Sequence, residues 1–119
     1  MNKKFPRSRR ITRANEFKVV WSKAKRLSGQ YITLVNCKND LGYPRLGLSF
    51  AKKQFPNASD RNRLKRVARE TFRLHQDKLD QFDVIVVGYK GANLLTPQQQ
   101  HNLFNSLWAR LAKQYTKLQ

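Results

Sequence analysis

Six of the thirteen residues from Arg61 to Arg73 are basic, and this segment holds the side chains whose types and spacing could do chemistry. A guanidinium group can pair with a phosphate through two parallel hydrogen bonds, and the Asn62 amide can bind a phosphate, a sugar or a base edge. The segment therefore predicts a phosphate-binding surface.

At about 100° per residue on a helix, most of these cations share one face. The residues within an arc of about 140° are Arg61, Lys65, Arg66, Arg69 and Arg73, and Arg63 lies at the border. The opposite side carries Leu64, Val67, Ala68, Thr71 and Leu74, with Phe72 as an exception on the basic side. A charged row is often only a solvated face, but such a face usually mixes acids with bases, and only Asp60 and Glu70 do so here. Repeated phosphate contacts explain the row better.

Catalysis by the protein itself is not expected. A two-metal phosphodiesterase needs clustered carboxylates, and the seven acids are scattered along the chain. His75 and His101 have no partner in the sequence that suggests a general acid–base pair, so we interpret both as structural or surface residues.

Length and charge limit the class of protein. A chain of 119 residues suits one domain, and 25 Lys and Arg against 7 Asp and Glu give a formal net charge of +18. Such an excess favours a polyanionic partner, and nucleic acid is the natural candidate. A membrane is a weaker one, because no run approaches ~20 apolar residues. No apolar run follows Lys3 and Lys4, and the single Cys37 excludes a disulfide framework, so we expect a cytoplasmic protein.

The elements that must position the basic surface follow from hydrophobic periodicity. Residues 1–11 look like a basic arm without fixed structure. A helix is predicted from an N-cap at Thr12 to an end between Lys25 and Gly29. Strands are predicted at 31–36 and 45–50, joined as an antiparallel pair by a short turn.

The second half of the chain predicts a helix, a strand and a final helix. The basic segment lies in a helix over 58–75, and the apolar run at 83–89 is typical of a strand covered on both faces. Thr96, Pro97 and Gln99 form a capping-box pattern at the start of the last helix. Its apolar stripe, with Phe104, Leu107 and Trp108, predicts packing on the sheet.

The run Arg61-Asn62-Arg63-Leu64-Lys65-Arg66 followed by Arg69-Glu70 resembles the signature of the bacterial ribonuclease P protein family, known for its Arg-Asn-Arg motif. Asn15-Glu16-Phe17 and Gly47-Leu48-Ser49, the latter followed by Ala51-Lys52-Lys53, stand in matching order, so the resemblance spans nearly the whole chain. Departures are small: Ser59 and Asp60 stand where the family often has an apolar and a variable residue, and Trp21 where Phe is common.

The resemblance implies an α+β fold, a two-layer α/β sandwich in the order αβββαβα with a left-handed β-α-β crossover. The general rule for parallel strands predicts a right-handed crossover instead. Only two strands are visible before the motif helix, so the third is implied by the resemblance, and we expect it near Arg26 to Gly29. Residues 1–119 would form a single RNA-binding domain.

The resemblance also implies a function, as the protein subunit of ribonuclease P, an endoribonuclease that matures the 5′ end of tRNA. A catalytic RNA would carry out hydrolysis with Mg²⁺, and the protein would bind no metal tightly and no small-molecule substrate. It would pair 1:1 with that RNA and bind precursor tRNA. The residues expected at the catalytic RNA are Arg61, Asn62, Arg63, Lys65, Arg66, Arg69 and Arg73. Those expected at the single-stranded 5′ leader of the precursor are Arg13, Phe17, Trp21, Tyr31, Lys52, Lys53 and Lys90.

The sequence also allows other interpretations of the aromatic pair and of the protein's class. Single strands are held by aromatic rings and cations, but Phe17 and Trp21 at i, i+4 spacing are also what a helix core would show. A ribosomal or other structural RNA-binding protein without a role in cleavage would share the charge and size. A DNA-binding module would place the basic helix in a major groove, although no dimerisation segment is visible.

Overall fold

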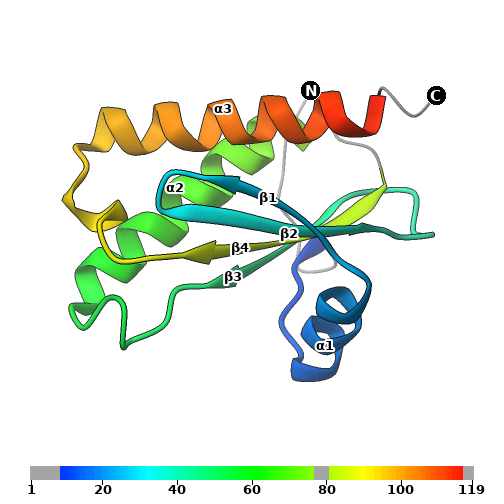
Figure 1. Ribbon diagram of the computed structural model, residues 1–119, viewed down its shortest axis with the longest axis horizontal. Helices are drawn as coiled ribbons and strands as arrows, with labels where there is room; N and C mark the ends of the chain where they lie inside the picture. Colours follow the sequence, from blue (N-terminus) through cyan, green and yellow to red (C-terminus); the bar gives the residue numbers. More distant parts are fainter. Residues whose placement is uncertain (1–8, 77–80, 117–119) are drawn as a thin grey trace.

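The computed structural model describes residues 9–76 and 81–116. Its elements are α1 (Ala14–Lys23), β1 (Lys25–Gly29), β2 (Ile32–Lys38), β3 (Arg45–Ser49), α2 (Ala58–His75), β4 (Phe82–Gly88), a short 3-10 helix η3 (Ala92–Leu94) and α3 (Pro97–Thr116). The predicted α+β order αβββαβα is confirmed. Figure 1 shows the layers, with α2 and α3 on one side of the sheet and α1 on the other. None of the described helices has the length and apolar character needed to cross a membrane.

The sheet has the strand order β1-β2-β4-β3, so the prediction of an antiparallel pair from 31–36 and 45–50 is wrong. β4 lies between β2 and β3, and its Ile85 pairs with Val35 of β2 and with Gly47 of β3. β4 runs antiparallel to β2 and parallel to β3. Its residues from Phe82 to Val86 are all buried, and such a run suits a central strand better than an edge.

β1 supplies the third strand at the place expected, near Arg26 to Gly29. It pairs antiparallel with β2. Because residues 25–29 belong to this strand, α1 is shorter than predicted and ends at Lys23, not between Lys25 and Gly29. The N-cap is Arg13 rather than Thr12. The Glu16 carboxylate accepts a hydrogen bond from the backbone N–H of Arg13 at 3.4 Å, which fixes the helix start one residue later than predicted.

Residues 1–8 of the expected basic arm lie outside the described residues. Residues 9–11 are part of the fold, so an arm without fixed structure does not extend to residue 11. The Ile11 backbone N–H donates to the Leu46 carbonyl at 2.8 Å, and Arg10 forms a parallel bridge to Leu46. Ile11 is buried, because the edge of β3 offers its backbone a partner and its side chain an apolar surface.

Two cores lie on opposite faces of the sheet, since neighbouring strand residues point to opposite sides. The main core joins the sheet to α2 and α3 and contains Leu34, Leu46, Val84, Val86, Leu64, Phe72, Phe104, Leu107 and Trp108 among others. The α1 core is smaller and contains Ile11, Val20, Val35 and Ile85, with Phe17 packed against it. The Thr96–Gln99 capping box is confirmed, with the Thr96 N–H donating to the Gln99 side chain at 2.8 Å.

The buried arc of α2 is rotated relative to the prediction. Leu64, Val67, Ala68 and Thr71 are buried as expected. Phe72, the apparent exception, is fully buried, and its ring meets Trp108 edge-on at 5.4 Å. Leu74 was expected to pack, but it is 52% exposed. The reason is that α2 packs against α3 in addition to the sheet. This second contact shifts the buried surface of α2 toward Phe72 and away from Leu74.

Candidate nucleic-acid interface

The basic helix α2 begins at a well-defined cap. Asn57 is the N-cap, and its side-chain oxygen accepts from the Ser59 backbone N–H at 2.9 Å. Arg61 donates through Nη1 to the Phe55 carbonyl at 2.6 Å and to the Pro56 carbonyl at 3.3 Å. The first of the expected RNA-binding cations thus also ties the preceding loop to the helix.

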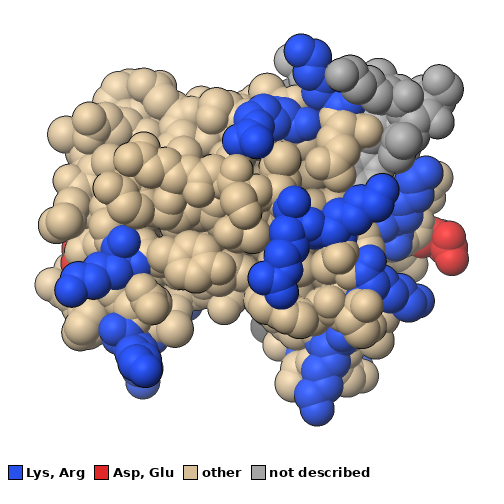
Figure 2. Space-filling model, viewed as in Figure 1, with Lys and Arg blue, Asp and Glu red and all other residues tan. Residues whose placement is uncertain are grey.

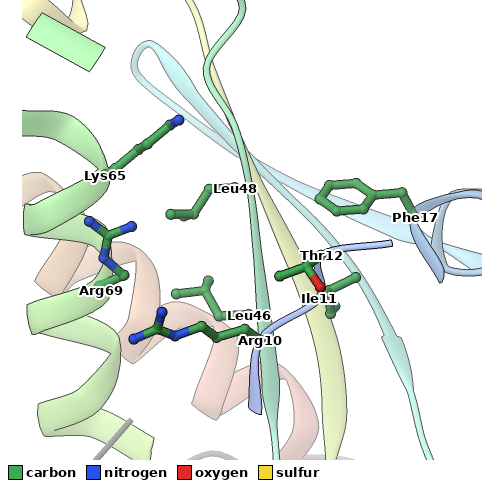
Figure 3. A pocket seen from close by; sticks show the side chains of 8 residues that line it. All are labelled: Arg10, Ile11, Thr12, Phe17, Leu46, Leu48, Lys65 and Arg69. Carbon is green, nitrogen blue, oxygen red and sulfur yellow. The ribbon is translucent and has the colours of Figure 1, made fainter. Parts of the chain in front are cut away.

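The other expected RNA-binding residues of α2 divide into two groups. Asn62, Arg63 and Arg66 are exposed. Lys65, Arg69 and Arg73 are half-buried, and the first two face the edge of β3 (Figure 3). Partial burial lowers the pKa of Arg69, and the charges of Arg10 and Arg66 lower it further. The cations therefore repel one another, and a polyanion would relieve that repulsion.

A cleft of about 280 Å³ joins these inner cations to the N-terminal segment and to α1. Its lining residues are Arg10, Ile11, Thr12, Phe17, Leu46, Leu48, Lys65 and Arg69. Figure 3 shows Leu46 and Leu48 projecting from β3 toward α2, while Phe17 lies on the other side of that strand. The surface expected to bind the catalytic RNA and the surface expected to bind the leader thus meet at one edge of the sheet.

Arg45 holds α1 on the sheet through two carboxylates. Its Nη1 donates to Glu16 Oε2 of α1 at 2.8 Å, and its Nε and Nη2 donate to the two oxygens of Asp83 on β4 at 2.9 and 2.7 Å. The Asp83 carboxylate also accepts from the Asn39 amide at 2.8 Å. This network fixes the position of the aromatic residues that α1 carries.

The two aromatic residues expected at the leader occupy different environments. Phe17 is half-buried in the α1 core, and a Cβ added at Gly47 would lie 3.0 Å from its Cζ. Gly47 therefore lets the Phe17 ring approach the strand closely. Trp21 is 44% exposed, and the Arg26 guanidinium lies over its ring at 5.4 Å. The core interpretation fits Phe17, and the open-platform interpretation fits Trp21.

The remaining expected leader residues do not all join this platform. Tyr31 packs against the main core from a left-handed backbone conformation, with φ of 63°, so it is not brought together with Phe17 and Trp21. Lys52 and Lys53 are exposed after β3, and Lys90 is exposed after β4. The Lys90 backbone N–H donates to the Gln54 side chain at 2.8 Å, which brings these two segments together.

Two cations that sequence reasoning did not select belong to these surfaces. Arg26 was missed because β1 has no clear alternation in the sequence, so its side chain could not be assigned to a face. Arg10 was assigned to the arm, but the structure places it at the rim of the cleft. The signal in the sequence that could have placed Arg10 in the fold was its neighbour Ile11, an apolar residue that the structure buries.

On the face of the molecule drawn in Figure 2, few acidic side chains lie near the basic ones. Figure 2 shows Lys and Arg gathered around α1 and over the loop between β3 and α2, with few acids among them. Among residues 9–76 and 81–116, no three His, Cys, Asp or Glu side chains form a group that could hold a metal ion.

A family model and related sequences both place this chain in one family. A family model described as Ribonuclease P matches residues 5–112. The chain is 41% identical over 106 residues to the ribonuclease P protein component of Proteus mirabilis, covering 89% of each chain. It is 38% identical over 109 residues to the ribonuclease P protein component of Vibrio cholerae, covering 92% of each.

Solved structures agree with these sequence matches. The RNase P protein of Staphylococcus aureus superposes with a TM-score of 0.80 and 28% identity, covering 86% of this chain and 94% of that one. The RNase P protein of Thermotoga maritima gives a TM-score of 0.75 and 26% identity, covering 85% and 96%.

Proposed function

The chain belongs to the ribonuclease P protein family, and from this premise we propose that it is the subunit that helps a catalytic RNA mature the 5′ end of precursor tRNA. It takes part in a ribonuclease P enzyme and acts with an RNA subunit and a tRNA substrate. The observation that carries the proposal is the crowded cationic surface of α2, within the segment that the family model matches.

We propose a division of labour between two surfaces. The exposed residues Asn62, Arg63 and Arg66, with the inner cations Lys65 and Arg69, bind phosphates of the catalytic RNA. Trp21, with Arg26 over its ring, offers a base of the single-stranded leader a stacking surface. Lys52, Lys53 and Lys90 neutralise the leader backbone farther along the sheet.

Hydrolysis is assigned to the RNA subunit with Mg²⁺, and the protein positions the substrate and supports the active RNA. The environments of the protein's acids support this assignment, because Glu16 and Asp83 are both bound by Arg45 in a structural network. We expect one protein per catalytic RNA, working in the cytoplasm where precursor tRNA is made.

The test is a reconstitution with a ribonuclease P RNA. The full-length protein should lower the Mg²⁺ concentration at which the RNA cleaves precursor tRNA at the mature 5′ end. The protein without RNA should cleave nothing at any Mg²⁺ concentration. Specific cleavage by the RNA-free protein, or no effect of the protein on the RNA-catalysed reaction, would overturn the proposal.

A further inference from the structure

The edge of the sheet that lies farthest from β3 carries a group of cations of its own. We call them the β1-edge cations: Lys25 and Arg26 on β1, and Arg110 and Lys113 on α3, all of them exposed. The strand order β1-β2-β4-β3 places β1 at the edge opposite β3. Among the side chains coloured in Figure 2, Lys and Arg follow the C-terminal half of α3 and the start of β1, and no acidic side chain lies between them.

Packing of α3 along β1 brings these cations together from distant parts of the chain. A Cβ added at Gly29 would lie 2.6 Å from the Leu107 side chain. Arg110 Nη1 donates to the Ser28 carbonyl at 3.4 Å. The contacts move back along β1 as they move forward along α3, so the two elements run in opposite directions (Figure 1). Lys113, one helical turn after Arg110, therefore lies toward the start of β1.

The charges of the β1-edge cations are not balanced by acidic side chains. No ion pair of theirs is found among residues 9–76 and 81–116. Arg110 donates to a neutral carbonyl, and Arg26 lies over the neutral ring of Trp21. Cations on an edge strand also keep that strand from pairing with another sheet, which would explain Lys25 and Arg26. It does not explain Arg110 and Lys113, which lie on a helix, so a polyanionic ligand explains the whole group better.

The β1-edge cations continue the surface proposed for the leader. Arg26 belongs to both, since its guanidinium lies 5.4 Å from the centre of the Trp21 ring. From Arg26, the next residue but one on the strand is Ser28, about 6.6 Å along, where Arg110 binds the backbone. Arg110 and Lys113 are about 5–6 Å apart on their helix. A single strand that leaves the Trp21 ring across this edge therefore meets positive charge at short intervals.

We propose that the β1-edge cations bind the phosphates of the distal leader, meaning the leader nucleotides farthest from the cleavage site. This inference rests on the proposed function and extends it. The lysines Lys52 and Lys53 lie just before α2, the helix proposed to bind the catalytic RNA, whereas β1 lies at the opposite edge of the sheet. The nucleotides near the cleavage site stay with the catalytic RNA, so those that reach β1 are remote from it. Phosphate contacts carry no base preference.

The test measures holoenzyme binding to precursor tRNAs whose leaders differ only in length. Leaders from about four to about 16 nucleotides cover the site sizes of small domains that bind single strands. With the wild-type protein, affinity should rise with leader length, and the rise should be absent with the RNA subunit alone. The double variant Arg110→Gln with Lys113→Gln should weaken binding of the long-leader precursor about 2- to 30-fold, the range for two exposed ion pairs. Binding of the short-leader precursor should not change.

The salt dependence gives a second readout. Each phosphate contact on a single strand contributes ~0.7 to the slope of log affinity against log salt, so the double variant should lower the slope for the long leader by about 1.4. Lys113→Gln alone removes a side chain that makes no ion pair among the described residues, and it should show the same effect at about half the size.

A matched double variant removes the same charge from another part of the leader path. Lys52→Gln with Lys53→Gln should weaken precursors with short and with long leaders equally, because these lysines contact leader nucleotides that both precursors contain. Binding of the Arg110→Gln, Lys113→Gln protein to the ribonuclease P RNA should equal that of the wild type. Thermal unfolding must show that each variant remains folded.

Four results would overturn the inference: an affinity that does not depend on leader length, a folded double variant on α3 that keeps the full gain with length, an equal loss for short and long leaders in that variant, or weaker assembly of that variant with the catalytic RNA. The last result would assign the surface to the catalytic RNA. If the wild-type protein neither binds nor activates the ribonuclease P RNA, the proposed function fails too. An active holoenzyme whose gain with leader length survives the double variant contradicts this inference alone.

Discussion

Arg45 joins Glu16 of α1 to Asp83 of β4, and this contact decides where the aromatic residues of α1 lie. Burial alone would raise the pKa of Glu16, but hydrogen bonds from the Arg45 side chain and the Arg13 backbone, with the Arg45 charge, outweigh it and hold the pKa below its ordinary value of 4.5. The Asp83 carboxylate in turn raises the pKa of Arg45, so the guanidinium stays charged. The residues lie far apart in the chain, and nothing in their spacing predicted the network.

The Glu16 ion pair predicts a pH dependence of stability. Because the pKa of Glu16 is lower in the folded protein than in the unfolded chain, the pair stabilises the fold above about pH 4.5, and this contribution is lost as the pH falls through the folded pKa. Glu16→Gln should reduce the free energy of unfolding at neutral pH by ~0.2–1 kcal/mol and flatten the loss below pH ~4.5. Urea unfolding at several pH values measures this.

The control for that experiment is Glu70→Gln on α2, whose carboxylate is 47% exposed and lies 3.7 Å from His101. If Glu70→Gln and Glu16→Gln flatten the acid limb equally, the Arg45 pair does not stabilise the fold.

Thr71 gives a second prediction about a single residue. The buried Trp108 indole N–H donates to the Thr71 hydroxyl at 2.8 Å. Thr71→Val keeps the side-chain shape but leaves that N–H without its partner, so the free energy of unfolding should fall by about 1–3 kcal/mol. Thr71→Ser keeps the hydroxyl and loses one methyl group, at about 0.8 kcal/mol. A Val variant as stable as the Ser variant would show that the hydrogen bond contributes nothing net.

At the level of elements, local patterns predicted the helices better than the sheet. The cap at Thr96 and the basic segment with its apolar side predicted α3 and α2, because caps and helical periodicity are local properties. The place of β4 between β2 and β3 depends on pairing between residues at least 38 positions apart, which no local pattern records. β1 was missed from the residues alone, since its exposed Lys25, Arg26 and Ser28 carry little strand propensity and its pairing with β2 decides its conformation.

The candidate site could likewise be predicted only where local sequence patterns were enough. The α2 cations could be selected from composition and spacing. The distinction between the exposed Arg66 and the cleft-lining Arg69 requires the position of β3. The different environments of Phe17 and Trp21 also depend on tertiary packing, because the two residues are one helical turn apart and equivalent in the sequence.

The two aromatic residues of helix α1 should differ in how much their removal destabilises the protein. Phe17→Ala removes a half-buried ring from Gly47 and the α1 core, so the free energy of unfolding should fall by about 2 kcal/mol, less than the ~3–5 kcal/mol of a fully buried Phe. Trp21→Ala removes an exposed ring and a cation–π contact and should cost less than about 1 kcal/mol. Thermal or urea unfolding compares them. A larger loss in Trp21→Ala would place Trp21 in the core and contradict the platform.

The charge distribution of the whole molecule predicts how RNA binding responds to salt. Arg61 donates to the loop before α2, and the other five cations expected at the catalytic RNA are Arg63, Lys65, Arg66, Arg69 and Arg73. Counterion release then gives a slope of log affinity against log salt of magnitude ~3.5–4.5. Arg63→Ala should reduce the slope by about one unit. Binding titrations across a range of salt concentrations measure it, and a nearly flat dependence would mean that the charge does not serve RNA binding.

The central claim is that this small protein bridges a catalytic RNA and the leader of its substrate through separate surfaces. The most direct test compares Arg63→Ala on α2 with Trp21→Ala on α1 by measuring protein binding to the ribonuclease P RNA, then holoenzyme binding to precursor tRNA and to mature tRNA. Arg63→Ala should weaken assembly with the RNA. Trp21→Ala should assemble normally, bind mature tRNA normally and bind precursor tRNA at least ~5-fold more weakly. If the two variants lose the same functions, or if folded Trp21→Ala holoenzyme binds a long-leader precursor as tightly as the wild type, the two-surface account is wrong.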